Sequence, residues 1–368
     1  MKRHLKNIAW LLLKCFFSTF FPLKKQVYFR AYNGLQYSCN PKAISVLLHS
    51  KNPDVRIVWC FSNPESITVP DYVCKVKKNS FQDIKALFTS KIWVMNVGMV
   101  IPSKRKGQIL IDTWHGDRAF KNVSMNVYGT PSSIAFEKVD YVLSGSDYAD
   151  KVYHEQLKIK GKILKTGSPR NDIFWENPDS LRLQIKKKLN LDAFDKVLMY
   201  APTFREYKMQ EKSLDFAKLI DMLNQRDSAK WCVLIRQHHK AAYDGSWEAD
   251  DRIFNVSKYP EMQELLILSD MVISDFSSLV GDYVLLKRPV VLYVPDMEKY
   301  RAGRGLNFNL EESPFIYAQT EDELFEKIKN LTEENGKKNC EDILDFYGNV
   351  VDDGKAAERV VSFIVGNL

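Results

Sequence analysis

The chain has 368 residues, of which 45% are hydrophobic, so it is long enough to bury two cores of ordinary domain size. Its 53 lysines and arginines exceed its 46 aspartates and glutamates, and the resulting charge of +7 favours acidic ligands or an anionic membrane surface. The sequence has no zinc-finger spacing, no RNA-binding aromatic motif and no long basic run, which argues against nucleic acid as a partner. Its six scattered cysteines form no C-x-x-C pair and no Cys/His cluster of zinc-ligand spacing, so we expect a reducing cytosol and no disulfide framework. We also expect neither a metal nor a cofactor.

The N-terminal segment combines basic residues with a bulky apolar run. Three basic residues within the first six positions precede the run 8–21, which contains Trp10, three leucines and four phenylalanines. Lys14 interrupts this run, no small-residue cleavage site follows it, and it is shorter than the roughly 20 apolar residues that span a bilayer. We therefore expect residues 1–25 to form a helix that lies on an anionic cytosolic membrane surface, with a buried helix or a signal anchor as alternatives.

From residue 27 onward, short β-branched or aromatic runs alternate with helical patterns. This alternation predicts parallel sheets joined by crossover helices, and hence an α/β fold. A polar, lysine-rich helix that starts at 175–180 predicts a domain boundary within 174–195. We expect two Rossmann-like domains, 26–180 and 181–368, that face one another across a cleft. The expected strands are 27–32, 56–61, 92–96, 108–113, 139–144, 163–166, 196–200, 231–236, 271–274 and 289–294. The expected helices are 41–50, 82–89, 147–158, 214–225, 261–268 and 277–286, with closing helices from 338.

Polar clusters directly follow five of the apolar runs. Ligands of open α/β sheets bind outside the carboxyl ends of the strands, so clusters at several strand ends predict one shared ligand site. The runs with their clusters are 109–116, 165–172, 197–205, 233–238 and 269–278.

The segment 269–278 predicts a phosphate-binding site. An apolar strand leads into Ser274-Asp275-Phe276-Ser277-Ser278, after which a helix is expected. The first N–H groups of a helix lack partners within it, and the helix dipole favours an anion there. Ser277 and Ser278 would add hydroxyl donors, whereas the alternative is an ordinary helix cap.

Two histidines are candidate catalytic residues. His115 follows a strand and precedes Gly116, which leaves the side chain little obstructed, and its ordinary pKa of about 6.5 suits a general base. A structural histidine that ties a loop is the alternative. His238 lies on the same face of an extended segment as Arg236, so both would point at one anionic group, while the adjacent His239 would point away.

Further polar residues of these clusters are candidate substrate ligands. Thr203 and Arg205 would meet a phosphate or the acceptor, although Arg205 could equally pair with Glu206. Asp282 lies one turn beyond Ser278 and would hold a substrate hydroxyl, or else occupy a solvated helix face.

The cluster 165–172 combines a turn glycine with residues that could pair with each other. Gly167 permits a tight turn, and Arg170 is either a substrate ligand or the partner of Asp172 in a local ion pair.

Taken together, these motifs resemble the CDP-glycerol glycerophosphotransferase family of bacterial teichoic-acid and capsule enzymes. The resemblance covers residues 27–310 and includes a family-like opening at 33–42. Two departures stand out: Asp117-Arg118-Ala119-Phe120-Lys121 replaces the common T-P-L-K, and Gly281-Asp282-Tyr283 replaces the usual F-D-F. The matching motifs, in order, are T-W-H-G at 113–116, G-S-P-R-N-D at 167–172, Y-A-P-T-F-R at 200–205, R-x-H at 236–238, and S-D-F-S-S at 274–278 followed by K-R-P at 287–289.

The resemblance implies a GT-B arrangement in which the C-terminal domain, 181–368, binds a CDP-alditol and the N-terminal domain, 26–180, serves the acceptor. It also implies that His115 is the base and that His238, Ser277 and Ser278 contact the donor diphosphate. The expected reaction moves glycerol phosphate or ribitol phosphate from its CDP carrier to a hydroxyl of a lipid-linked saccharide, teichoic acid or capsule acceptor, and CMP leaves.

Two alternatives to this function remain at this point. A GT-B glycosyltransferase would use the same fold but release a nucleoside diphosphate, and a non-catalytic relative would be expected to lose His115 or His238. The resemblance further implies peripheral attachment to the cytoplasmic face of a bacterial membrane. The sequence leaves the alditol, the acceptor, the number of units added and a homo-oligomeric state open.

Overall fold

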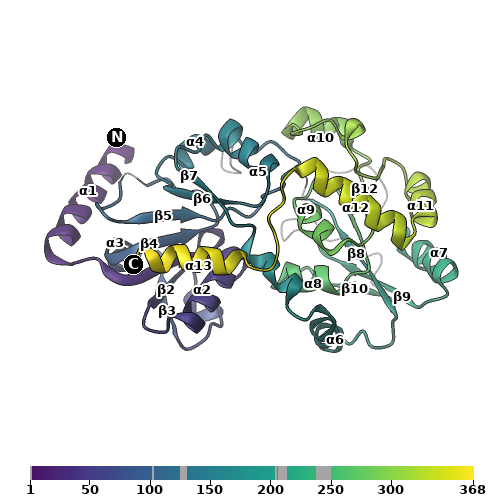
Figure 1. The fold of residues 1–368 in the computed structure, drawn as a ribbon, viewed down its shortest axis with the longest axis horizontal. Helices are drawn as coiled ribbons and strands as arrows, with labels where there is room; N and C mark the ends of the chain where they lie inside the picture. The colour runs from purple at the N-terminus through teal and green to yellow at the C-terminus, as the bar shows by residue number, and fades with distance from the viewer. Residues whose placement is uncertain (1, 102, 125–130, 204, 206–213, 238–249) are drawn as a thin grey trace. The chain divides into compact units, whose positions relative to one another are not determined.

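The computed structural model describes residues 2–101, 103–124, 131–203, 205, 214–237 and 250–368. The chain divides into two compact units (Figure 1). Unit 1 comprises Met1–Asp117, Val123–Asp172 and Asn349–Leu368, and unit 2 comprises Arg118–Asn122 and Ile173–Gly348. Each unit is an α/β fold with a parallel sheet, so the predicted fold class is confirmed.

Within the described residues, unit 1 has a seven-stranded parallel sheet in the order β3-β2-β1-β4-β5-β6-β7. The inner strands read as continuous apolar runs, such as Ile57–Phe61 in β2, because helices and loops bury both of their faces. The strand order reverses between β1 and β4. The strands are β1 (Lys24–Arg30), β2 (Arg56–Phe61), β3 (Val73–Lys77), β4 (Ser90–Met95), β5 (Ile109–Asp112), β6 (Tyr141–Ser144) and β7 (Lys162–Lys165).

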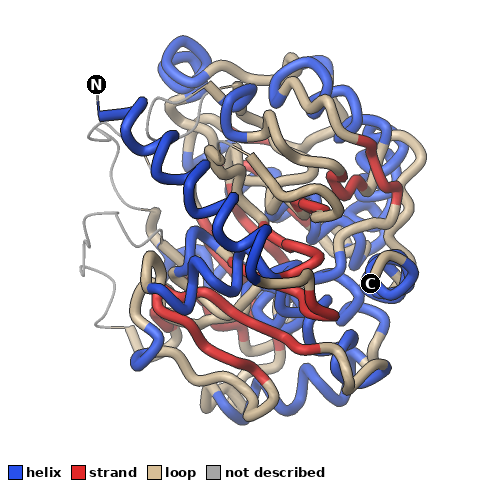
Figure 2. The backbone as a smooth tube through the Cα atoms, turned by 90° about the vertical axis from the view of Figure 1, so that its left-hand side faces the viewer, coloured by secondary structure: helices blue, strands red, loops and turns tan. Residues whose placement is uncertain are grey.

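The helices of unit 1 begin at clear sequence signals. The Ser80 hydroxyl accepts a hydrogen bond from the Asp83 N–H at the start of α3, and Ser146 caps α5 in the same way. Figure 2 shows α1 as the long helix that begins at the label N, and α1 packs on α3. The helices are α1 (Lys2–Phe20), α2 (Cys39–Lys51), α3 (Phe81–Thr89), α4 (Ser132–Ala135), α5 (Asp147–Val152) and α13 (Ala356–Gly366), with short turns at Tyr32–Gly34, Pro64–Ser66 and Tyr153–Leu157.

The described part of unit 2 has a six-stranded parallel sheet in the order β10-β9-β8-β11-β12-β13. Its core places β9 against the apolar face of α7, where Leu219, Ile220 and Leu223 are fully buried. The strands are β8 (Lys196–Ala201), β9 (Trp231–Ile235), β10 (Ile253–Asn255), β11 (Met271–Ser274), β12 (Val290–Tyr293) and β13 (Tyr317–Ala318). The helices are α6 (Pro178–Lys188), α7 (Phe216–Asp227), α8 (Met262–Leu268), α9 (Leu279–Tyr283), α10 (Met297–Arg304), α11 (Glu321–Asn330) and α12 (Glu333–Tyr347), with short turns at Val284–Leu286 and Leu310–Glu312. The turn at Pro169–Trp175 begins in unit 1 and ends in unit 2.

The two units differ from the predicted ranges 26–180 and 181–368 both at the boundary between them and at the C-terminus. The chain leaves unit 1 after Asp172, and helix α13 returns to unit 1 rather than closing the second domain. The cause is packing, because Val360, Val361 and Ile364 are buried in the core of unit 1 beside α2 (Figure 1). The Asp172 carboxylate also accepts hydrogen bonds from the first N–H groups of α13, those of Ala356 (3.0 Å) and Ala357 (2.7 Å).

Candidate active site

In each unit the strand order of the described sheet reverses once, and three of the five predicted polar clusters follow strands at or next to these two places, whereas 165–172 follows the edge strand β7 and 233–238 follows β9. In unit 1 the reversal separates β1 from β4, and in unit 2 it separates β8 from β11. Adjacent crossovers leave the two strands in opposite directions at such a point, which opens a crevice at their carboxyl ends where ligands bind. The motifs around His115 and around Asp275 follow strands at or next to these reversals.

His115 lies beyond the carboxyl end of β5, next to the end of β4. Its Nδ1 is 2.7 Å from the backbone oxygen of Asn96, the residue that follows β4. Since a carbonyl oxygen only accepts hydrogen bonds, Nδ1 must carry the proton, and in the neutral ring Nε2 then keeps the lone pair. The ring is half-buried and meets Tyr32 edge-on, with 5.4 Å between centroids. The histidine is thus held in the tautomer that a general base with an active Nε2 requires.

The loops around His115 contain backbone strain. Four non-glycine residues adopt left-handed φ angles there: Tyr32 at 45°, Asn33 at 59°, Cys39 at 65° and Trp114 at 49°. Such conformations cost energy and are concentrated at functional sites, where the surrounding structure holds them in place.

Two buried side chains hold Trp114 in its strained conformation. The Asp112 carboxylate accepts a 2.8 Å hydrogen bond from the Trp114 N–H, and the Asn40 amide donates to the backbone oxygens of Thr113 and Trp114, both at 3.1 Å. Trp114 in turn donates from its indole nitrogen to the backbone oxygen of Gly116 (3.1 Å). These bonds fix the backbone on both sides of His115.

Asp112 is 1% exposed at the end of β5. Burial raises the pKa of its carboxyl group to about 7, although the hydrogen bond from Trp114 and the charge of Arg30 act in the opposite direction. The pKa of this carboxyl group therefore lies near neutral pH.

In unit 2, a buried carboxylate joins the ends of β8 and β11. Asp275 accepts hydrogen bonds from the N–H (2.9 Å) and the hydroxyl (2.5 Å) of Thr203, and it forms an ion pair of 2.8 Å with Arg205. Arg205 also binds both oxygens of Asp296, at 2.6 and 3.0 Å. Burial acts against the charged guanidinium, but the bonds to Asp296 and the charge of Asp275 outweigh it, so the pKa of Arg205 is raised. Arg205 therefore remains a cation at this strand end.

Ser277 and Ser278 are half-buried and begin the turn that leads into α9. Their backbone oxygens accept hydrogen bonds from Val280 (3.2 Å) and Gly281 (3.1 Å). Helix α9 covers only Leu279–Tyr283 before it tightens into a 3-10 turn, so it is shorter than the predicted helix 277–286. The two serines lie directly after the strand beside the reversal, where the phosphate-binding prediction requires them.

Residues 118–122, which we call the strap, belong to unit 2 although the chain on either side belongs to unit 1. Arg118 is 1% exposed and donates to the backbone oxygen of Gly281 (3.2 Å), with its Nη1 4.0 Å from Asp282. A Cβ atom at Gly281 would lie 2.5 Å from the Cβ of Arg118. The two departures from the family motifs are therefore coupled, because Gly281 makes room for Arg118.

Asp282 is buried, which excludes the solvated helix face considered for it. It is 4% exposed and accepts a hydrogen bond from the Gln263 amide (3.2 Å). The substrate-hydroxyl role for Asp282 stays a prediction.

Of the remaining predicted residues, Arg236 and Arg170 form hydrogen bonds with neighbouring loops and helices. Arg236 donates to the backbone oxygens of Tyr259 (2.6 Å) and Val256 (3.4 Å), which anchors the loop after β10. Arg170 is buried, and its N–H donates to the Asn40 side chain (3.0 Å). His238, His239 and the Glu206 proposed as a partner of Arg205 lie outside the described residues.

The turn at Gly167 has the left-handed backbone that the sequence predicted. Its φ is +83°, and an added Cβ would lie 3.3 Å from Asp352 and from Ala356. This glycine shapes the contact between its loop and the start of α13, so its role here is structural.

Sequence reasoning missed two asparagines of the site. Asn96 supplies the carbonyl that binds His115, and its side-chain oxygen accepts a hydrogen bond from the Tyr32 N–H (2.8 Å). The rule used for the other clusters would have found it, because Asn96 is the first polar residue after the apolar run of β4. Asn40 gave no such signal, since it lies on α2 and reaches the site only through folding.

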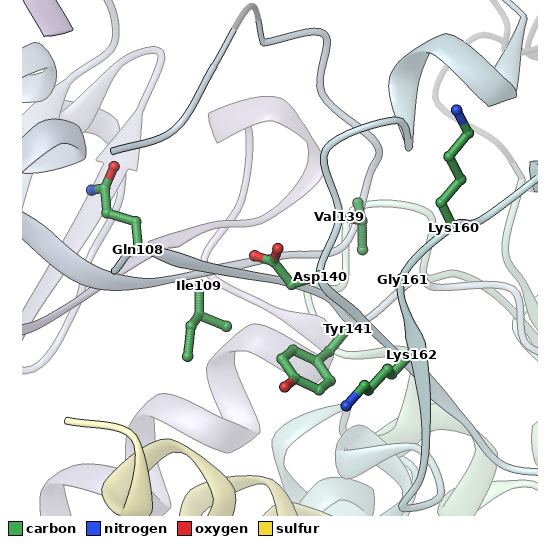
Figure 3. A pocket seen from close by; sticks show the side chains of 8 residues that line it. All are labelled: Gln108, Ile109, Val139, Asp140, Tyr141, Lys160, Gly161 and Lys162. Atoms are coloured by element: carbon green, nitrogen blue, oxygen red, sulfur yellow. The ribbon is translucent and has the colours of Figure 1, made fainter. Parts of the chain in front are cut away.

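A surface hollow in unit 1 lies at the opposite edge of the sheet (Figure 3). Ile109, Tyr141 and Lys162, which line it, start strands β5, β6 and β7, so the hollow is at the amino ends of the strands. Ligands of open α/β sheets bind at the carboxyl ends. We therefore do not assign this hollow to the active site.

Comparison with known proteins gives consistent matches. A family model described as CDP-glycerol:poly(glycerophosphate) glycerophosphotransferase matches residues 14–366. A teichoic acid glycerol-phosphate transferase of Staphylococcus aureus is 30% identical over 368 residues, which cover 93% of this chain and 93% of the relative. A teichoic acid poly(glycerol phosphate) polymerase of Staphylococcus epidermidis is 31% identical over 92% of this chain, which spans only 50% of the length of that relative.

A solved structure agrees with these matches over nearly the whole chain. The wall teichoic acid polymerase TagF superimposes with a TM-score of 0.85 at 27% identity, covering 99% of this chain and 96% of the solved one. The similarity therefore extends over both units.

Proposed function

The chain belongs to the CDP-glycerol:poly(glycerophosphate) glycerophosphotransferase family, and on that premise we propose that it transfers an alditol phosphate, glycerol phosphate or ribitol phosphate, from a CDP-alditol. The acceptor is a hydroxyl group of a lipid-linked saccharide, teichoic acid or capsule polymer, and CMP is released. The observation that carries the proposal is the tautomer of His115, whose Nδ1 is bound to the Asn96 carbonyl and whose Nε2 is therefore basic.

In this mechanism the two units have separate tasks. His115 in unit 1 takes the proton from the acceptor hydroxyl, whose oxygen attacks the phosphorus atom that carries the alditol. The bond between that phosphorus and the bridging oxygen of the diphosphate breaks, and the electron pair leaves with CMP. In unit 2, the N–H groups and hydroxyls at Ser277 and Ser278, together with His238, bind the phosphate charge that grows during this step. The sequence prediction that no metal or cofactor takes part stays a prediction.

The decisive experiment incubates the purified chain with CDP-glycerol or CDP-ribitol and a lipid-linked acceptor. We expect CMP and an acceptor whose mass has increased by one or more alditol phosphates. Release of a nucleoside diphosphate, with a sugar added instead, would identify a glycosyltransferase and refute the proposal.

The role of His115 has its own test. His115→Ala should retain CDP-alditol binding but lose at least about 100-fold in turnover, the lower range for removal of a general base. His154→Ala is the matched control, because His154 is an exposed histidine of the same unit. Near-normal turnover of a folded His115→Ala variant would contradict the assignment.

A second part of the proposal concerns the cytoplasmic face of a bacterial membrane, where a lipid-linked acceptor would be found. Among the described residues, no helix is long and apolar enough to cross a bilayer. Helix α1 has one face that packs on α3, where the ring of Phe17 stacks on Phe88 with 5.6 Å between centroids. Its other face is apolar but exposed, with Leu12 66% and Phe20 67% accessible. An anionic lipid surface would cover this face and attract the lysines that flank it.

Charge substitutions on the exposed face test this docking without disturbing the packed face. Leu12→Glu combined with Phe20→Glu should abolish sedimentation with anionic vesicles but preserve transfer to a soluble, short-chain acceptor. Leu183→Glu is the control, because Leu183 is an equally exposed leucine (61%) on α6 of unit 2. Unchanged sedimentation of the double variant would show that another surface docks the membrane.

A further inference from the structure

The strap, residues 118–122, lies along the loop that follows α10. Lys121 forms an isolated antiparallel bridge with Leu306, and the Asn122 N–H donates to the backbone oxygen of Gly305 (3.1 Å). The Asn307 side chain donates to the backbone oxygens of Ala119 (2.9 Å) and Lys121 (3.1 Å). Lys121 is therefore held on a fixed backbone within unit 2, beside the end of α10.

The strap is also anchored by a buried aromatic ring. Phe120 is 1% exposed and packs against Phe308 and Phe315, with centroid distances of 5.2 and 4.7 Å. The buried ring of Phe120 therefore fixes the backbone directly before Lys121, in addition to the bridge to Leu306.

The Lys121 ammonium group is in an unusual electrostatic environment. It is half-buried, and burial lowers the pKa of Lys121, as does the positive charge of Arg304 nearby. Among the residues that the structure describes, none forms a hydrogen bond or an ion pair with this ammonium group.

The carboxylate that acts on Lys121 is already bound to other groups. Asp275 acts on Lys121 electrostatically, but its carboxylate accepts the N–H and hydroxyl of Thr203 and pairs with Arg205. The second carboxylate of the cluster, Asp296, binds the same Arg205 through two hydrogen bonds. Both carboxylates are therefore engaged by Arg205, and neither forms an ion pair with Lys121 in the described part of the chain.

We propose that Lys121 and Arg304 form an anion-binding pair that holds a phosphate group of the donor nucleotide during transfer. Lys121 interacts electrostatically with Asp275, two residues before Ser277, so the pair adds side-chain cations to the groups proposed to bind the donor phosphate. A half-buried cation without a carboxylate partner reduces stability, and a phosphate that enters the site supplies the missing partner. The identity of the nucleotide rests on the proposed function, whereas the recognition of phosphate does not.

Lys121→Met tests the pair, because methionine keeps the length of the side chain and removes only its charge. We expect affinity for CDP-glycerol, measured by calorimetry, to fall about 10- to 100-fold, as for loss of a charge-assisted hydrogen bond. Affinity for cytidine, which has no phosphate, should not change. The melting temperature of the ligand-free variant should stay level or rise, since an unpaired half-buried charge has been removed.

Two further variants separate binding from structure. Lys121→Arg keeps the charge and should recover most of the affinity for CDP-glycerol. Lys329→Met removes one charge from an exposed position on α11 of the same unit and should leave the affinity unchanged.

The possible outcomes distinguish this inference from the proposed function. Unchanged CDP-glycerol affinity in Lys121→Met, or an equal loss of cytidine affinity, overturns the pair even if the parent chain transfers alditol phosphate normally. If the parent binds UDP-glucose rather than CDP-glycerol and Lys121→Met weakens that binding, the proposed function fails and the pair stands. Failure of the parent to bind either nucleotide overturns the pair.

Discussion

Asp112, which holds the loop of His115, is expected to make the free energy of unfolding depend on pH. Its carboxyl group is buried at the end of β5, and its pKa is raised by burial to about 7 from the ordinary value of 3.8. A raised carboxyl pKa means that the folded state binds this proton more tightly than the unfolded state does. Stability from this group is therefore fully present below about pH 4 and is lost as pH rises through about 7.

Asp112→Asn tests this coupling, since the asparagine oxygen still accepts the Trp114 N–H but carries no charge. The rise in pKa from 3.8 to about 7 corresponds to about 4 kcal/mol at neutral to alkaline pH. Relative to the parent, the variant should gain about 1.4 kcal/mol per pH unit between pH 4 and pH 7, and nothing more above that range.

Urea unfolding at a series of pH values measures this difference, and hydrogen exchange of peptides that cover β5 reports it locally. Asp71→Asn is the control, because Asp71 is an exposed aspartate of the same unit and its replacement should leave the profile parallel to the parent. A free-energy difference between Asp112→Asn and the parent that does not vary with pH would refute the reasoning. It would mean that water or a rearranged side chain solvates Asp112 in the folded state.

The other predictions concern unit 2. Ser277→Ala combined with Ser278→Ala should weaken CDP-alditol binding in calorimetry, because two hydroxyl donors are removed; affinity equal to the parent's would place the phosphate site elsewhere. Gly281→Ala should lower the free energy of unfolding by about 1–3 kcal/mol, since its Cβ would lie 2.5 Å from that of Arg118. Gly303→Ala, where an added Cβ meets no atom within 4 Å, is its control in urea titrations, and equal stability of the two variants would contradict the clash.

The alternating pattern of the sequence predicted ten strands, and each is present with small shifts at its ends. Three further strands escaped prediction for physical reasons. β3 (Val73–Lys77) alternates apolar with lysine residues at the edge of its sheet, while β10 and β13 span only three and two residues. Short edge strands carry little apolar signal, because one side of the ribbon remains open to solvent.

The positions of the candidate residues were predictable, but their partners were not. The clusters that contain His115, Thr203 and Ser277 were found because a polar residue that follows an apolar run marks the end of a buried strand, but Asp112 and Asp275 were not singled out within them. The partners of Arg205, in contrast, are Asp275 and Asp296, the latter 91 positions along the chain. Contacts of that separation depend on which strands become neighbours, and the local pattern does not encode this order.

At both places where the strand order reverses, a buried aspartate holds the backbone of a neighbouring loop. In unit 1 the Asp112 carboxylate binds the N–H of Trp114, and in unit 2 the Asp275 carboxylate binds the N–H of Thr203. A buried carboxylate costs stability, and an apolar residue of similar size would often cost less. Its presence at both strand ends is explained if a rigid loop matters more than stability there, because phosphoryl transfer depends on how accurately the base and the phosphate-binding groups are positioned.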